Sequence, residues 1–123
     1  MSQAAEHTAA AILSEARGLL VSGWSRGAQA RDRAGNVVPA WSEDARSWSL
    51  LGALLASWQR QDEDLDVDFV AHAIDARALG DATQAIGEVT GTAAIERWND
   101  DPARTQDEVL ATIDRALEVL ALP

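Results

Sequence analysis

Apolar residues recur every three or four positions along most of this chain, the spacing that places them on one face of an α-helix. The first such stripe comprises Ala5, Ala9, Ile12, Ala16 and Leu19 or Leu20. It predicts a helix from Gln3 to Val21. Similar patterns predict helices over residues 43–60, 66–79, 81–89 and 93–98, and a last helix from Thr105 to the C-terminus. We therefore expect a mainly α-helical single domain over residues 1–123, a compact bundle of about five helices.

Several of the predicted helix ends carry capping residues. Thr105-Gln106-Asp107-Glu108 is a capping box, in which the threonine and glutamate side chains satisfy each other's free backbone amides. Ser42 is the expected N-cap of the second helix. Gly23 and Gly80 are expected to end the first and third helices. Gly52 lies on the apolar stripe of the second helix and indicates a close helix crossing.

The segment that follows the first helix has the pattern of a small β-hairpin. Short stretches at residues 28–31 and 36–38 flank the turn Asp32-Arg33-Ala34-Gly35. The glycine can take the positive φ that closes such a turn. Two short strands are stable only when they pack against another element.

Composition excludes several classes of protein. Hydrophobic residues make up 47% of the chain and charged residues 24%, which is typical of a globular rather than a disordered protein. The absence of cysteine excludes disulfides, thiolate metal sites and a cysteine nucleophile. No apolar run has the length of a membrane span, and the N-terminus lacks the pattern of a secretory signal. The expected location is the cytoplasm.

Charge is distributed unevenly along the chain. Residues 1–60 hold six arginines and five acidic residues, whereas residues 61–123 hold four arginines and fifteen acidic residues. The two parts carry net charges of +1 and −11, which give the overall −10. So acidic a surface repels phosphates, and direct nucleic-acid binding is not expected. It suits a basic protein partner or mimicry of a phosphate backbone, although a merely solvated surface is the favoured interpretation.

The acidic run from Asp62 to Asp68 suggests a calcium-binding loop but lacks the residues that such a loop requires. In a loop that begins at Asp62, Val67 stands where glycine is required and Ala73 where a bidentate glutamate is required. A loop that begins two residues later also lacks the glycine. A solvated connector is the favoured interpretation, and neither a metal nor another cofactor is predicted.

His72 is the one histidine with carboxylates at helical spacing. Asp68 lies four residues before it and Asp75 three residues after it, so all three can share one helical face. A histidine oriented by a carboxylate suits general-base catalysis, but no serine is placed locally as a nucleophile. An ordinary surface interaction is the favoured interpretation, and an enzyme is the weakest functional hypothesis.

Five tryptophans occur in a chain with one phenylalanine and no tyrosine. Trp48 and Trp58 lie on the stripe of the second predicted helix and are expected in the core. Trp24, Trp41 and Trp98 lie near predicted loop junctions, where an indole can line a pocket or an interface.

Three arginines, Arg26, Arg31 and Arg33, lie in the hairpin region that follows Trp24. Guanidinium groups beside exposed indoles can bind a phosphate or a carboxylate and stack on a planar group. In the alternative, the rings cover the edge of the core and the arginines stay solvated. The candidate ligand-binding residues are Trp24, Arg26, Arg31, Trp98, Asn99 and Asp100.

The string Trp98-Asn99-Asp100-Asp101-Pro102 is the most distinctive in the chain. Asn99 and Asp100 can bind nearby backbone amides and so end one helix before the next begins. That structural role is sufficient to explain the string. In the functional alternative, both side chains point into a site beside Trp24 and the hairpin arginines.

Four strings together resemble an uncharacterised family of small proteins from actinobacteria and their phages, a domain of unknown function. They are Gly23-Trp24-x-x-Gly27, Ala30-Arg31-Asp32-x-x-Gly35, Leu51-Gly52-Ala53-Leu54 and Trp98-Asn99-Asp100-x-Pro102-x-Arg104-Thr105. The resemblance covers nearly the whole chain. It implies a cytoplasmic, single-domain protein without a membrane span, encoded on mobile DNA, and it implies no catalytic activity.

Three functional hypotheses follow. The leading one is a small acidic, non-enzymatic interaction module that binds a protein partner or itself, such as an inhibitor or adaptor from a phage or mobile element that covers a basic protein surface. The second is a protein that binds a small anionic or nucleotide-like ligand through the candidate residues given above. The third is an enzyme that uses His72.

Overall fold

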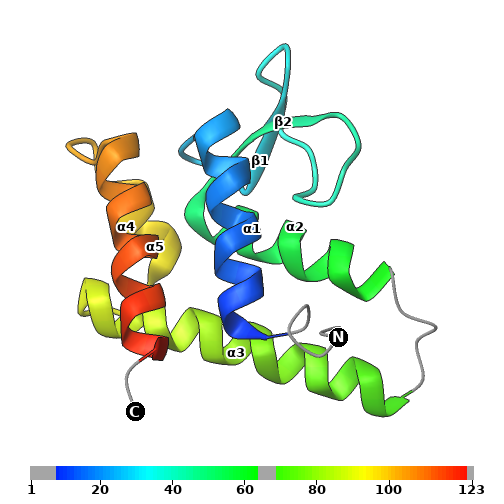
Figure 1. The fold of residues 1–123 in the computed structure, drawn as a ribbon. Helices are drawn as coiled ribbons and strands as arrows, with labels where there is room; N and C mark the ends of the chain where they lie inside the picture. Colours follow the sequence, from blue (N-terminus) through cyan, green and yellow to red (C-terminus); the bar gives the residue numbers. More distant parts are fainter. Residues whose placement is uncertain (1–7, 64–68, 122–123) are drawn as a thin grey trace.

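The computed structural model describes residues 8–63 and 69–121 of the chain, and the side chains of residues 8–59 and 76–121. The elements in chain order are α1 (Ala9–Ser22), β1 (Ala30–Asp32), β2 (Ala45–Trp48), α2 (Leu50–Glu63), α3 (Phe69–Thr90), α4 (Ile95–Asn99) and α5 (Gln106–Ala121) (Figure 1). The described part is therefore mainly helical, with a two-stranded antiparallel sheet after the first helix, as predicted.

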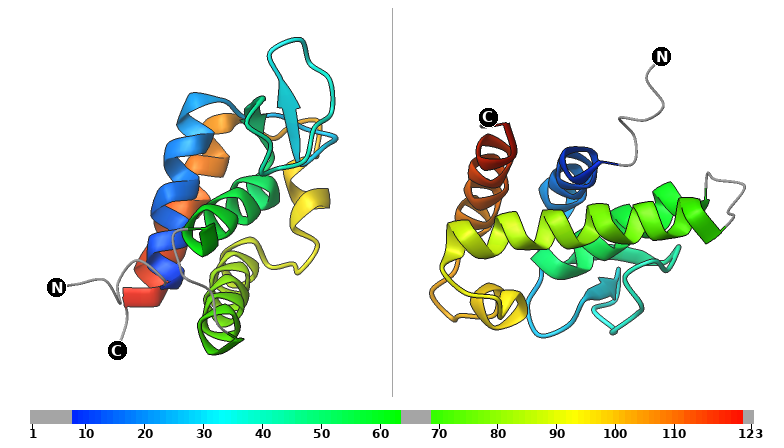
Figure 2. Two further views of the ribbon diagram at one scale, coloured as in Figure 1. Left: turned by 90° about the vertical axis from the view of Figure 1, so that its right-hand side faces the viewer. Right: turned by 90° about the horizontal axis from the view of Figure 1, so that it is seen from below.

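The long helices cross one another around a single core. α1 and α5 lie side by side, and α2 and α3 run across them (Figure 2). Each of these helices contributes aliphatic side chains to the core, and in α1 they come from the predicted stripe. The largest fully buried apolar side chains are Ile12, Leu13, Leu20, Leu50, Leu54, Ile86, Val109 and Ile113.

α1 begins later than the sequence indicated. The Oγ1 of Thr8 accepts a hydrogen bond from the backbone N of Ala11 at 3.1 Å, so Thr8 is the N-cap of this helix. The predicted start at Gln3 is therefore wrong, because the extended backbone at Thr8 interrupts any longer helix. The predicted end is confirmed, since the helix stops at Gly23.

The prediction of a helix over residues 43–60 is wrong in its first part. Residues 45–48 form β2, whose residues Ala45 and Trp48 are buried against the core. α2 starts only after this strand, and its N-cap is Ser49, whose Oγ accepts from the backbone N of Gly52 at 3.0 Å. The predicted cap, Ser42, instead accepts from the backbone N of Asp44 in the turn before β2.

The predicted turn of the hairpin is confirmed, but the main strand partner differs. Gly35 has φ +89°, and the Asp32 carboxylate accepts from the backbone N of both Ala34 and Asn36. The hydrogen bond from Asn36 lowers the pKa of Asp32. β1 pairs with β2 along its length, whereas the predicted return strand at residues 36–38 forms a single bridge, between Val37 and Arg31.

The predicted break at Gly80 is absent, because α3 is one continuous helix. Ala78 and Ala82 are buried on either side of this glycine, together with Ala85 and Ile86 one turn further on. Packing of this face outweighs the cost of about 1 kcal/mol that glycine imposes inside a helix. The predicted interruption at residues 90–92 is confirmed, and Gly91 there has φ +81°.

The capping box at the start of α5 is confirmed atom by atom. The backbone N of Thr105 donates to Glu108 Oε1 at 2.9 Å, and the backbone N of Glu108 donates to Thr105 Oγ1 at 3.2 Å. Further along, Asp114 accepts two hydrogen bonds from the guanidinium of Arg17, at 2.7 and 3.2 Å. This bidentate pair joins α5 to α1.

Gly52 allows a close contact, although its partner is a loop and not a helix as predicted. A Cβ built on Gly52 would overlap the carbonyl oxygen of Gln29, in the segment that leads into β1. The backbone N of Ser49 also donates to this carbonyl, at 3.1 Å. The absence of a side chain at Gly52 therefore lets the first turn of α2 pack directly on the hairpin.

Among the described residues, no helix contains an apolar stretch long enough to span a lipid bilayer.

We expect Gly52→Ala to lower the free energy of unfolding by about 2 kcal/mol or more, because the new methyl group must displace backbone. The matched control is Gly80→Ala, where nothing lies within 4 Å of the added Cβ. That variant should be more stable by about 0.5–1 kcal/mol. Urea denaturation measures both, and similar effects of the two substitutions would contradict the close contact.

Candidate functional site

Asn99, the last residue of α4, is fully buried, and its side-chain amide forms four hydrogen bonds. Its Oδ1 accepts from the indole Nε1 of Trp24 at 2.7 Å and from the backbone N of Leu50 at 3.0 Å. Its Nδ2 donates to the backbone oxygen of Ser25 at 3.1 Å and to Asp100 Oδ1 at 3.0 Å. These bonds occupy both lone pairs and both hydrogens of the amide. Asn99 therefore joins three segments: the loop after α1, the start of α2 and the end of α4.

Asp100 continues this network toward the surface. Its Oδ1 also accepts from the backbone N of Gly27 at 3.0 Å. The loop before Gly27 is held from its other side by β2, because the backbone N of Trp48 donates to Gly23 and the backbone N of Ser25 donates to Trp48, both at 3.0 Å. The loop is thus fixed between β2 and the end of α4.

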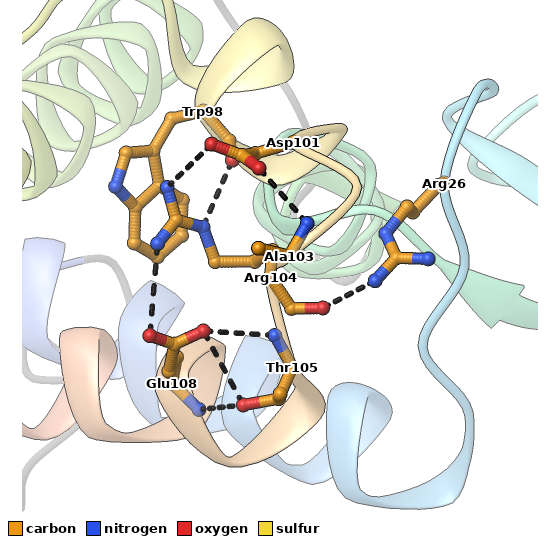
Figure 3. Close-up of polar contacts among 7 residues, drawn as sticks. All are labelled: Arg26, Trp98, Asp101, Ala103, Arg104, Thr105 and Glu108. Atoms are coloured by element: carbon orange, nitrogen blue, oxygen red, sulfur yellow. Dashed lines mark hydrogen bonds and ion pairs between the residues drawn. The ribbon is translucent and has the colours of Figure 1, made fainter.

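Two arginines stack on two of the tryptophans at the edge of this network. The guanidinium carbon of Arg26 lies 4.7 Å from the ring centroid of Trp24, and that of Arg104 lies 3.8 Å from the ring centroid of Trp98. Arg26 also donates to the backbone oxygen of Arg104, and Arg104 Nε donates to the backbone oxygen of Trp98 at 3.0 Å (Figure 3). Two carboxylates flank the Arg104 guanidinium, those of Asp101 at 4.0 Å and Glu108 at 3.8 Å.

Arg31 folds back over its own hairpin. Its Nη1 donates to the backbone oxygen of Gly35 at 3.0 Å and its Nη2 to the backbone oxygen of Arg26 at 3.2 Å. The structure therefore brings all six predicted site residues into one region. Each of the six contributes a polar group to a hydrogen bond inside the protein. Their binding of a ligand stays a prediction.

Arg104 is not among the candidate site residues predicted from the sequence. It nevertheless connects two of them, because its guanidinium stacks on Trp98 and its backbone oxygen accepts a hydrogen bond from Arg26. The signal that could have identified Arg104 is its position in the distinctive string that begins at Trp98 and ends Arg104-Thr105. A hollow of about 520 Å³ borders this group, and it is lined by Arg97, Asp100, Asp101 and Pro102. Asp100 is the one predicted site residue among these.

Glu96, one turn before Asn99, carries a perturbed carboxyl group. Burial raises the pKa of Glu96, a hydrogen bond with Ser49 offsets part of this effect, and the charge of Asp100 adds to it. Its Oε1 is buried and has no hydrogen-bond partner among the described residues. Because the pKa is higher in the folded state than in the unfolded chain, ionisation of this group weakens the fold.

We expect Glu96→Gln to raise the free energy of unfolding near neutral pH. The gain should shrink as the pH falls through the raised pKa, because the native carboxyl group is then protonated and no longer costs stability. Urea denaturation between about pH 4 and pH 8 measures this, with the exposed residue Glu118→Gln as the control that changes little. A gain of the same size at all pH values would contradict the burial of this charge.

Besides a hollow at the C-terminal end of α3, two hollows of the described part that are lined by charged residues lie away from this network. One lies between α3 and α5 and is lined by Ala9, Asp81, Gln84, Ala85, Glu88, Val119 and Leu120. The other lies beside β2 and is lined by Ser22, Arg33, Trp41, Ser42, Glu43, Ala45, Arg46, Trp48 and Gln59. The sequence singled out Trp41 and Arg33, but it could not bring them together with Arg46, because residues 43–60 were interpreted as a helix.

Two sequence features lie outside the residues whose side chains the structure describes. They are the acidic run from Asp62 to Asp68, and the group of His72 with Asp68 and Asp75, for which a surface interaction is the favoured interpretation. Among the described side chains, no three acidic or histidine residues gather in a way that could hold a metal ion.

Comparison with known proteins gives a family and no function. Residues 4–119 match the model of a family described as "Family of unknown function (DUF6197)". No curated protein and no solved structure matches the chain.

Proposed function

The chain belongs to the DUF6197 family, whose function is unknown, and we propose from its own residues that it is a small acidic, non-enzymatic module that binds a basic segment of a partner protein. The observation that carries this proposal is the groove between α3 and α5, which combines apolar side chains with carboxylates that have no ion pair or hydrogen bond among the described residues. We call it the acidic groove.

The acidic groove has a volume of about 320 Å³ and lies where the C-terminal part of α5 crosses α3 (Figure 1). Ala85, Val119 and Leu120 supply its apolar part, and Asp81 and Glu88 supply its charge. Apolar side chains of a partner can be buried there, which favours a protein segment over a simple cation.

Asp81 and Glu88 are separated by seven residues on α3, which is two helical turns on the same face, or about 10 Å. Neither carboxylate forms an ion pair or a hydrogen bond with another residue of the described part. A partner helix that presents arginine or lysine at two positions one heptad apart, with leucine-like residues between them, matches this arrangement.

The net charge of the chain also favours a basic partner. The net charge is −10, which accelerates encounter with a basic protein and repels nucleic acid. This is consistent with a module that covers the nucleic-acid-binding surface of its partner, in the manner of an inhibitor encoded by a phage or a mobile element.

We expect the chain to bind a synthetic amphipathic helical peptide with arginines one heptad apart and leucines between them, with affinity that falls as salt rises. Asp81→Asn combined with Glu88→Gln should weaken binding about tenfold, which corresponds to about 1.4 kcal/mol. Isothermal titration calorimetry measures both.

The matched control is Glu43→Gln combined with Asp44→Asn, which changes the net charge equally in the loop before β2. It should leave the peptide affinity within about twofold. Equal weakening by both pairs would contradict the groove and leave only general attraction between opposite charges. A peptide that does not bind at all would contradict the proposal.

A further inference from the structure

A second hollow, independent of the acidic groove, lies on the hairpin side of the molecule. It has a volume of about 730 Å³, within the range of about 300–1,000 Å³ that is usual for small-molecule sites. Its walls come from the turn before β2, from β2 itself and from single residues of α1, α2 and the hairpin turn. We call it the Trp41 cleft.

The ring of Trp41 is an unusual surface feature for this chain. Its side chain is 58% exposed, whereas Trp48, which lines the same cleft, is 5% exposed. The indole N–H of Trp48 donates to the backbone oxygen of Ala40 at 3.0 Å, while that of Trp41 has no hydrogen bond within the described part. A planar group that covered the Trp41 ring would remove a large apolar surface from water and gain a stacking contact.

Two arginines line the cleft, and each has guanidinium N–H groups that form no hydrogen bond with a described residue. Arg33 forms no hydrogen bond or ion pair with a described residue. The Nη1 of Arg46 donates to the backbone oxygens of Glu43 and Ala45, at 2.9 and 2.8 Å. These two bonds orient the Arg46 guanidinium and leave its Nε and Nη2 for a ligand.

The count of charges limits the kind of anion that fits. Two guanidinium groups and one carboxylate, that of Glu43, give the lining a formal charge of +1 in a chain of −10. The Debye length in physiological salt is about 8 Å, so a small anion inside the cleft is little affected by distant carboxylates. A polyanion that extends beyond the cleft meets the acidic remainder of the surface.

From these observations we propose that the Trp41 cleft is a binding site for a small planar organic anion of the aromatic carboxylate class. The aromatic body stacks on the Trp41 indole, and the carboxylate accepts hydrogen bonds from the guanidinium groups of Arg33 and Arg46. The site is separate from the network around Asn99 and from the acidic groove, so it does not depend on the function proposed above.

The test is a titration of the full-length, ¹⁵N-labelled protein with 1-naphthoate, followed by NMR. We expect saturable shifts of the Trp41 indole N–H and of the Arg33 and Arg46 Nε–H signals, with the Trp24 indole signal unchanged. The neutral analogue 1-naphthalenemethanol should bind at least about fivefold more weakly, because it lacks the charge.

Two substitutions give opposite expected effects. Arg33→Gln removes a guanidinium that forms no hydrogen bond or ion pair with a described residue and should weaken 1-naphthoate binding at least about fivefold. Glu43→Gln removes the one carboxylate of the lining and should strengthen it. Arg97→Gln, outside the cleft, is the matched control and should change the affinity by less than twofold.

Equal binding of the neutral analogue, or an Arg33→Gln variant that binds as well as the native protein, would overturn the proposal. So would the absence of saturable shifts. Shifts centred on Trp24 instead of Trp41 would also overturn it, and would place the ligand among the residues that the sequence had singled out.

Discussion

The fold depends on one buried side-chain amide. Three of the four hydrogen bonds of Asn99 join segments that are 49 to 75 residues apart in the chain. Removing the side chain would leave the buried Leu50 amide without this partner, at about 1–3 kcal/mol, and would also break the bonds to the part-buried Trp24 indole N–H and Ser25 carbonyl. Asn99 therefore adds bonds to α2 and α4 for a loop that β2 and Asp100 also hold.

This network also determines which surfaces are left for binding. It occupies polar groups of Trp24, Arg26, Arg31, Asn99 and Asp100. The acidic groove and the Trp41 cleft retain charged groups, Asp81, Glu88 and Arg33, that form no ion pair or hydrogen bond with a described residue, and the two hollows carry opposite local charge. A rigid centre with two separate, differently charged hollows suits a module that binds one partner through each.

Local signals in the sequence were reliable where the physical cause was local. The capping box at Thr105 and the turn at Gly35 need only neighbouring residues, and both are as predicted. Trp48 was placed on a helix because its spacing fits one, but pairing with the distant β1 makes it a strand residue. A position of Asn99 beside Trp24 was one of two alternatives, but its hydrogen bonds to Leu50 and Ser25 could not be predicted, because both residues are distant in the sequence.

Hydrogen exchange of the tryptophan indoles tests the central claim most directly, because each indole N–H gives its own NMR signal. If Asn99 holds the fold together, the Trp24 indole N–H and the Leu50 amide should exchange as slowly as the amide of Ile113 in the core, through global unfolding. The exposed Trp41 indole should exchange fast in the same sample. A Trp24 indole that exchanges as fast as that of Trp41 would contradict the account.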